Sequence, residues 1–175
     1  MKESDILPIT GHLAQTNLLK NVSEEKIAEF ASICRKVIFK KGDVIVREGD
    51  IGDTMYMIVE GTVEVARTLV FEDLDEKNPL GNKVFAKLSA KDHAVFGEIS
   101  LLESSPRTAT ITALTDSFFY EIKRADFLRL ARKDSELGFQ IIYNVATVLG
   151  ARLRKADEDI TKLTTVLTIV LKESV

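Results

Sequence analysis

The spacing of apolar and polar residues changes twice along this chain of 175 residues. Between residues 23 and 35, apolar side chains recur at the spacing of one helix face, and Ser23 before two glutamates is typical of a helix start capped by a hydroxyl. From Val37, short apolar runs separated by glycines take over, and after Lys123 helical spacing returns. The pattern predicts an α+β fold, with a short N-terminal helix, an antiparallel β-roll or jelly roll of about eight strands, and a long C-terminal helix.

The strand-like zone is marked by β-branched and aromatic residues between turn signals. Gly49 and Gly61 lie at the tips of two predicted turns, where glycine adopts a positive φ without steric cost. Residues 71–81 form an acidic stretch that contains a proline, and we expect an exposed hairpin loop there. The predicted strands carry the sequences VIF, VIV, MYMIV, VEVA, KVFAKL, ATITAL and SFFYEI.

The C-terminal zone begins with a short helix that Lys133-Asp134-Ser135 interrupts, after which one long helix follows. Apolar residues then recur in alternating steps of four and three, the seam of a two-stranded coiled coil, and predict a homodimer through residues 142–170. The alternative is that this stripe packs on the chain's own roll, which would have to cover about 40 Å of helix. Residues 164–175 are rich in Thr and Val and are expected to fray or bend. The seam is Ile142, Ala146, Leu149, Leu153, Ala156, Ile160, Leu163, Leu167 and Val170.

This pattern divides the chain into residues 1–135, the N-terminal helix with the β-roll, and residues 136–175, a helical region expected to serve as lid and dimerisation coil. Apolar residues make up 45% and charged residues 29%, as in ordinary globular domains. The net charge is −3 and no long run of like charges occurs, so nucleic acid is not an expected partner. The cluster Arg152, Arg154 and Lys155 is interpreted as a solvated helix face.

Cysteine and histidine usage restricts the chemistry further. Cys34 is the only cysteine, which excludes an internal disulfide and indicates a buried structural thiol. His12 and His93 lie far apart in the sequence, so no multi-histidine metal site is expected. No apolar stretch resembles a signal peptide or is long enough to span a membrane, and the expected location is the cytoplasm.

A motif at residues 96–110, FGEISLLESSPRTAT, carries the candidate chemistry. Gly97 admits close backbone approach, Glu98 opens a stretch that can form one helical turn, and free amides at a helix start attract anions. Pro106 stiffens the turn that brings Arg107, whose planar guanidinium matches two phosphate oxygens. A carboxylate beside a phosphate site makes sense if the ligand offers a hydroxyl to Glu98 and a phosphate to Arg107. The alternative is a plain ion pair between these two residues.

FGEISLL followed by PRTATI resembles the phosphate-binding cassette of cyclic-nucleotide-binding domains, and residues 41–65 resemble the glycine-marked roll of the same family. The resemblance covers about residues 18–157 and is to an effector domain like that of catabolite activators. It implies that Glu98 accepts from the ribose 2′-hydroxyl and that Arg107 neutralises the cyclic phosphate. The other implied contacts are the Ile99 and Ser100 amides with the phosphate, Thr108 with phosphate or purine, Gly97 beneath the ribose, and Val65 and Phe85 as apolar wall for the base.

Two departures from the family pattern bear on the ligand. The segment Lys91–Val95 that leads into the cassette is longer than usual, and Ala156-Asp157 stands where catabolite activators carry a Thr-Ser pair that reads adenine. The Asp157 carboxylate can accept from the adenine amino group or from guanine N–H groups, so the resemblance favours cAMP and leaves cGMP open.

The function expected from this resemblance is a non-enzymatic regulatory module without cofactor or metal, signalling through a hinge near residues 133–138 to an unidentified effector. The DNA-binding helix-turn-helix that usually follows is missing from the sequence. One alternative is a degenerate module that keeps the fold for dimerisation or docking but binds no nucleotide. A metal-dependent enzyme on a similar roll is disfavoured because it needs clustered histidines.

Overall fold

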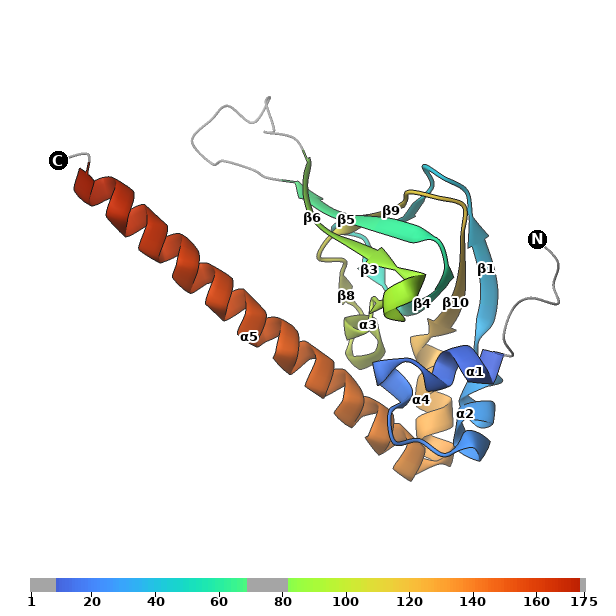
Figure 1. Ribbon diagram of the computed structural model, residues 1–175. Coiled ribbons are helices and arrows are strands. Elements are labelled where there is room, and N and C mark those ends of the chain that lie inside the picture. The colour runs from blue at the N-terminus through green and yellow to red at the C-terminus, as the bar shows by residue number, and fades with distance from the viewer. Residues whose placement is uncertain (1–8, 69–81, 174–175) are drawn as a thin grey trace.

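The structure of the protein is a computed structural model that describes residues 9–68 and 82–173. It has the predicted α+β fold: N-terminal helices, a β-roll and a long C-terminal helix (Figure 1). The residues that the structure describes form ten strands rather than about eight, because three of them have only two residues and are too short to leave a pattern in the sequence. The acidic stretch 71–81, predicted as a hairpin loop, lies outside the described residues.

The elements follow one another in the predicted order. The helical elements before the roll are α1 (Ile9–Ala14), the 3-10 turn η2 (Asn17–Leu19) and α2 (Glu24–Ala31). The strands are β1 (Arg35–Phe39), β2 (Val44–Val46), β3 (Ile51–Gly52), β4 (Thr54–Glu60), β5 (Thr62–Thr68), β6 (Asn82–Ser89), β7 (Val95–Phe96), β8 (Ser105–Pro106), β9 (Thr110–Ala113) and β10 (Ser117–Lys123). Two short helical elements lie within the roll, η3 (Ala90–Asp92) and α3 (Ile99–Leu102), and α4 (Arg124–Lys133) and α5 (Ser135–Glu173) follow it.

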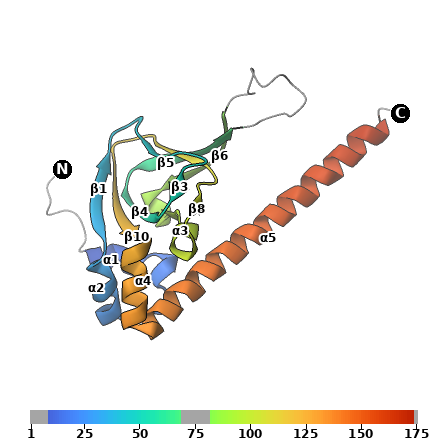
Figure 2. The same ribbon diagram turned by 180° about the vertical axis from the view of Figure 1, so that it is seen from behind.

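Two four-stranded antiparallel sheets form the roll. Their strand orders are β1-β10-β4-β7 and β2-β9-β5-β6, and β3 pairs with β8 as a separate two-stranded ribbon. Both predicted glycine turns are present, because Gly49 and Gly61 have φ of 85° and 97°. Helices α1, α2 and α4 gather at one end of the roll, as Figures 1 and 2 show from opposite sides. Helix α3 (Ile99–Leu102), within residues 96–110, contacts α4 at this end of the roll.

Strands β4 and β10 are buried on both faces, which explains why their sequences are continuous apolar runs rather than alternating ones. Met55 and Met57 of β4 belong to the core between the roll and the helices. Tyr56 and Ile58, with the opposite parity, belong to the core inside the roll. One strand thus joins the helical layer to the wall of the roll interior.

The helix boundaries differ from the sequence pattern at α2, which ends at Ala31 instead of near Arg35, where β1 begins. Ser23 occupies the N-cap of α2, but its side chain makes no capping hydrogen bond, so the predicted hydroxyl cap is wrong. The break between α4 and α5 falls at Asp134, as predicted. The Asp134 carboxylate accepts a hydrogen bond from the Leu137 amide at 3.0 Å and Lys26 of α2 binds it at 3.1 Å, so this junction is tied to the N-terminal helices.

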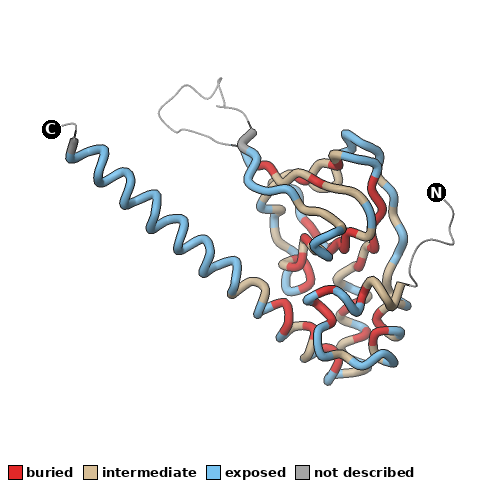
Figure 3. The backbone as a smooth tube through the Cα atoms, viewed as in Figure 1, coloured by how far each residue is buried: buried red, intermediate tan, exposed pale blue. Residues whose placement is uncertain are grey.

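Helix α5 has two different halves. Its first turns pack on the domain through Leu137, Ile141 and Val145, whereas residues 151–172 are all exposed (Figure 3). The alternative that the apolar stripe packs on the chain's own roll is therefore wrong for residues 151–172. The helix also continues to Glu173 instead of fraying after 164, and the hydroxyls of Thr164, Thr165 and Thr168 bond to carbonyls one turn earlier.

Candidate ligand-binding site

A cavity of about 390 Å³ opens beside α3, between the roll and α5. Its volume lies in the range of small-molecule sites, and apolar side chains meet a few polar groups in it. The apolar wall is made by Val46, Val65, Ala86, Leu88, Phe96 and Ile111 from five strands. The polar end comes from the start of α3, the segment between β8 and β9, and α5, and is made by Glu98, Ser100, Arg107, Thr108 and Arg152.

The chain enters the polar end through a tight turn at Gly97. Its φ is 73°, and a Cβ atom there would lie 2.7 Å from both the Thr54 carbonyl oxygen and Nη1 of Arg107. Any side chain would therefore clash with the neighbouring strand and displace the guanidinium. Glycine at this position allows the backbone to lie close to both neighbours, and α3 follows as the single helical turn that the sequence predicts.

Arg107 is held both by its backbone and by its side chain. Its amide donates to the Asp50 carbonyl at 2.8 Å, and its carbonyl accepts from the Gly49 amide at 2.9 Å. In the side chain, Nη1 donates to the Thr54 carbonyl and to Ser100 Oγ, both at 2.8 Å, and Nη2 donates to Thr54 Oγ1 at 2.7 Å. An arginine has five N–H donors. Two of them, on Nε and Nη2, are left without an acceptor among the described residues.

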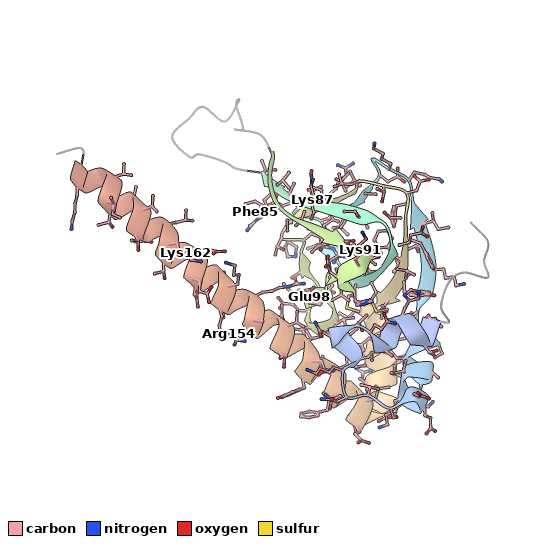
Figure 4. The ribbon with its side chains drawn as sticks, in the orientation of Figure 1. Phe85, Lys87, Lys91, Glu98, Arg154 and Lys162 are labelled. Atoms are coloured by element: carbon pink, nitrogen blue, oxygen red, sulfur yellow. The ribbon has the colours of Figure 1, made fainter. Side chains whose placement is uncertain are left out.

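Glu98 is buried and pairs with Arg152 of α5, not with Arg107. Oε1 accepts from Nη1 of Arg152, and Nη2 of Arg152 also donates to the Val95 carbonyl at 3.2 Å. The other oxygen, Oε2, is buried and has no hydrogen-bond partner among the described residues. Figure 4 shows Glu98 on the side of the roll that faces α5. The alternative of a Glu98–Arg107 ion pair is therefore wrong, and Arg152 belongs to the site rather than to a solvated face.

Seven of the nine predicted site residues line this one cavity: Val65, Gly97, Glu98, Ile99, Ser100, Arg107 and Thr108. The Ser100 amide, however, already donates to the Gly97 carbonyl at 3.0 Å. Of the two predicted phosphate-binding amides, only that of Ile99 lacks an acceptor among the described residues. Ser100 contributes to the site through its hydroxyl instead, which accepts a hydrogen bond from Arg107.

Phe85 and Asp157 do not line the cavity. The register between β5 and β6 shifts at Phe85, between the pairs Val65–Ala86 and Ala66–Val84, so that Ala86 shares the cavity wall with Val65 and Phe85 is 54% exposed. Asp157 follows Arg152 by five residues and so lies about 140° around the helix from it. When Arg152 faces the cavity, Asp157 faces away.

The remaining candidate chemistry lies elsewhere. His12 and His93 come together at a small cavity of about 10 Å³ between α1 and the roll, although they are far apart in the sequence. Burial lowers the pKa of His12, and His93 lowers it further by charge repulsion.

Within residues 9–68 and 82–173, no three His, Cys, Asp or Glu side chains are grouped so that they could hold a metal ion. None of the helices described has the length and apolar character needed to cross a membrane.

Comparisons with known proteins point to one family. The family described as "Cyclic nucleotide-binding domain" matches residues 36–134. The cAMP-dependent protein kinase regulatory subunit of Dictyostelium discoideum is 36% identical over 118 residues, which are 67% of this chain and 34% of that protein.

Solved structures are similar as well. The catabolite activator protein of Thermus thermophilus has a TM-score of 0.71 at 27% identity, covering 85% of this chain and 63% of its own. The N-terminal domain of a Streptomyces coelicolor transcriptional regulator has a TM-score of 0.68 at 29% identity, covering 85% and 94%. The chain spans 34%, 23% and 58% of the first three curated relatives, so it corresponds to one part of those longer proteins.

Proposed function

Because the chain belongs to the cyclic nucleotide-binding domain family, we propose that it is a regulatory module that binds cAMP or cGMP in the cavity beside α3. The observation that carries this proposal is the buried Oε2 of Glu98, an acceptor without a partner among the described residues, in the same cavity as two uncommitted N–H groups of Arg107. Buried polar groups in folded proteins nearly always have partners, so a ligand is the natural source of the missing ones.

The two groups specify complementary ligand chemistry. An ionised carboxylate only accepts, so Glu98 requires a donor such as a ribose hydroxyl. The Nε and Nη2 groups of Arg107 point along one edge of the guanidinium, a fork that matches two oxygens of a phosphate. A ribose 3′,5′-cyclic phosphate presents a free hydroxyl next to an anionic phosphate. The apolar wall around Val65 and Leu88 is left for the purine.

Of the two cyclic nucleotides, we favour cAMP as the ligand. The first three curated relatives are named as cAMP-dependent or as a cyclic AMP receptor, while a Drosophila cGMP-dependent kinase also matches at 29% identity. Thr108 lines the cavity beside Arg107 and offers one hydroxyl to either base.

Isothermal titration calorimetry with cAMP and with cGMP tests the proposal on the native chain and on Arg107→Ala. We expect saturable binding of one or both nucleotides and a loss of at least about tenfold in affinity in the variant, since a charge-assisted phosphate contact is removed. Absence of binding heat with both nucleotides in the native chain would refute nucleotide binding. It would favour a docking module that keeps only the fold.

We further propose that α5 carries the signal and pairs with a second copy of the chain. From Leu153 onward the heptad seam is fully on the surface, with Leu153 64%, Ile160 61% and Leu163 70% exposed. A contiguous apolar stripe of this length on a soluble domain calls for a partner surface, and a matching parallel helix fits a spacing of four and three. The exposed stripe begins at Leu153, directly after Arg152, which lines the cavity. Dimerisation and ligand binding would therefore involve the same helix.

Sedimentation equilibrium of Leu153→Glu tests the dimer. A glutamate in the seam brings two like charges together, and the variant is expected to sediment as a monomer while the native chain is a dimer. Arg154→Glu places the same charge one residue away from the seam and serves as the matched control, which should remain dimeric. An unchanged mass of Leu153→Glu would show that the seam lies elsewhere.

A further inference from the structure

A single residue of the neighbouring strand β4 accepts two of the three hydrogen bonds that the Arg107 side chain donates. Thr54, the first residue of β4, accepts from Nη2 through its hydroxyl at 2.7 Å and from Nη1 through its carbonyl at 2.8 Å. These two bonds occupy the end of the guanidinium formed by both terminal nitrogens. The side edge formed by Nε and Nη2 is thereby left for the cavity.

The hydrogen bonds continue beyond Thr54 into the wall of the roll. Thr54 Oγ1 donates to the Tyr56 hydroxyl at 3.3 Å, and the Tyr56 hydroxyl donates to Glu121 Oε1 at 3.1 Å. Thr54 and Tyr56 are only 9% and 6% exposed. Tyr56 and Glu121 are directly opposite each other in the β4–β10 register. The chain therefore connects the guanidinium to a carboxylate on the strand that leads into α4.

The direction of every bond in this chain is fixed by its ends. Arginine can only donate and an ionised carboxylate can only accept, so each hydroxyl between them receives from the arginine side and donates toward Glu121. Burial raises the pKa of Tyr56, which keeps the phenol protonated as the last donor. A chain with one allowed direction holds its members in one arrangement, and each bond polarises the next.

We propose that Thr54 and Tyr56 are positioning residues that hold the side edge of Arg107 toward the ligand phosphate, with Glu121 as the anchor of the chain. This inference rests on the proposed function of the cavity, because it concerns how the phosphate-binding group is oriented. A free arginine side chain has rotamer entropy to lose when it binds a ligand. Fixing Arg107 in advance removes that cost from the binding step.

The geometry ranks the contributions. Thr54 makes two short bonds to the guanidinium, one of which uses its hydroxyl, whereas the Thr54–Tyr56 contact of 3.3 Å is long for an O–H···O bond. Removing the Thr54 hydroxyl should therefore weaken nucleotide binding more than removing the Tyr56 hydroxyl. We expect Thr54→Val to lower the affinity for cAMP about tenfold and Tyr56→Phe about threefold, in line with hydrogen bonds to charged and neutral groups.

Calorimetric titration with cAMP of matched variants tests this ranking. Thr54→Val is nearly isosteric but has no hydroxyl, and Thr54→Ser restores the hydroxyl and should bind within about twofold of the native chain. Circular dichroism and thermal unfolding verify that each variant is folded. If Thr54→Val does not fold, the comparison of Tyr56→Phe with the native chain decides instead. Native affinity in the folded variants would overturn the proposal.

A double-mutant cycle separates positioning from general support of the roll. In an Arg107→Lys background a cation remains, but the fork that Thr54 orients is gone. The further loss from Thr54→Val should then fall from about tenfold to less than about twofold, because coupled residues are not additive. An equal tenfold loss in both backgrounds would mean that Thr54 acts on the roll and not through Arg107.

A measurement without nucleotide keeps this inference distinct from the proposed function. The Nε–H signal of Arg107, assigned by its disappearance in Arg107→Lys, should be sharp in the nuclear magnetic resonance spectrum of the free native chain. In Thr54→Val it should broaden or shift toward the free-arginine position, and in Thr54→Ser it should not. A native chain that shows this behaviour but binds neither nucleotide would refute the proposed function alone. An Nε–H signal that is unchanged in Thr54→Val would refute the positioning.

Discussion

Replacing Arg152 by glutamine isolates the contact between α5 and the cavity. The Glu98 side chain is 4% exposed and the Arg152 side chain 49%, so the ion pair is half-screened by solvent. Exposed pairs contribute up to about 1 kcal/mol, and removing one partner of a fully buried pair costs about 3–5 kcal/mol. An intermediate loss of about 1.5 kcal/mol is expected for Arg152→Gln, because Glu98 Oε2 already lacks a partner among the described residues and Oε1 would lose its own.

Urea unfolding followed by far-ultraviolet circular dichroism measures this loss, at one fixed protomer concentration since the proposed dimer would couple to folding. Arg154→Gln is the matched control, because the same change of charge and helix propensity occurs two residues away without a contact to Glu98. For a chain of this size, 1.5 kcal/mol corresponds to a lowering of the melting temperature by about 3–6 °C. Salt of about 1 M should reduce the difference between the two variants. If both variants unfold within about 0.5 kcal/mol of each other, the ion pair does not stabilise α5 on the domain.

Three further predictions address the site and the core. Gly52→Ala should lower both the cAMP affinity in calorimetric titration and the melting temperature, because a Cβ there would lie 2.3 Å from Nε of Arg107 and moving the guanidinium away breaks its hydrogen bonds to Thr54 and Ser100; native affinity would contradict this. Glu98→Gln should weaken cAMP binding by about tenfold or more but change binding of 2′-deoxy-cAMP much less, since a hydrogen bond from the 2′-hydroxyl to a charged acceptor is lost only in the first case; equal losses for both ligands would contradict it. Burial raises the pKa of the Cys34 thiol to about 12, so the native chain binds a proton between pH 9 and 12 that the unfolded chain releases, and its stability should fall as pH rises through that interval. Urea unfolding across that interval should show a smaller fall in Cys34→Ala, and an equal fall would assign the pH dependence to other groups.

The sequence predicts those parts of the fold whose signal is local. The run MYMIV predicts a strand because glycines and polar residues bound it, and the structure buries both of its faces as β4. The heptad spacing predicts α5, and the polar run Lys133-Asp134-Ser135 predicts the break between α4 and α5 that falls at Asp134. In contrast, β3, β7 and β8 have two residues each and form only because the turns around them bring partners together. No periodicity exists over such a length.

Part of the site could not be predicted from the sequence, for two physical reasons. Parity along a strand is reliable only while the register is regular, and the shift at Phe85 exchanges it with Ala86 on the cavity wall. Arg152 lies in a polar stretch of a helix, and such a stretch is usually a solvent-exposed face without a binding role. Its role depends on the angle at which α5 leaves the domain, which is set by distant contacts such as those at Asp134. The signal that would have helped is the phase of Arg152 relative to the seam, since it lies on neither the seam nor the opposite face.

The position of Arg152 on α5 explains how one contact can serve both ligand and partner. Up to Leu149 the helix packs against the domain, and from residue 151 it is exposed, so Arg152 stands on the first free turn. Its guanidinium holds the same Glu98 carboxylate that we assign to the ribose hydroxyl. A ligand changes the helix only if it binds one arrangement of α5 more tightly than another. With Glu98 proposed to bind the ligand and paired with Arg152 of the helix, the strength of the Glu98–Arg152 pair with and without nucleotide would set that difference. The Arg152→Gln variant should then both loosen the helix and reduce the effect of nucleotide on it.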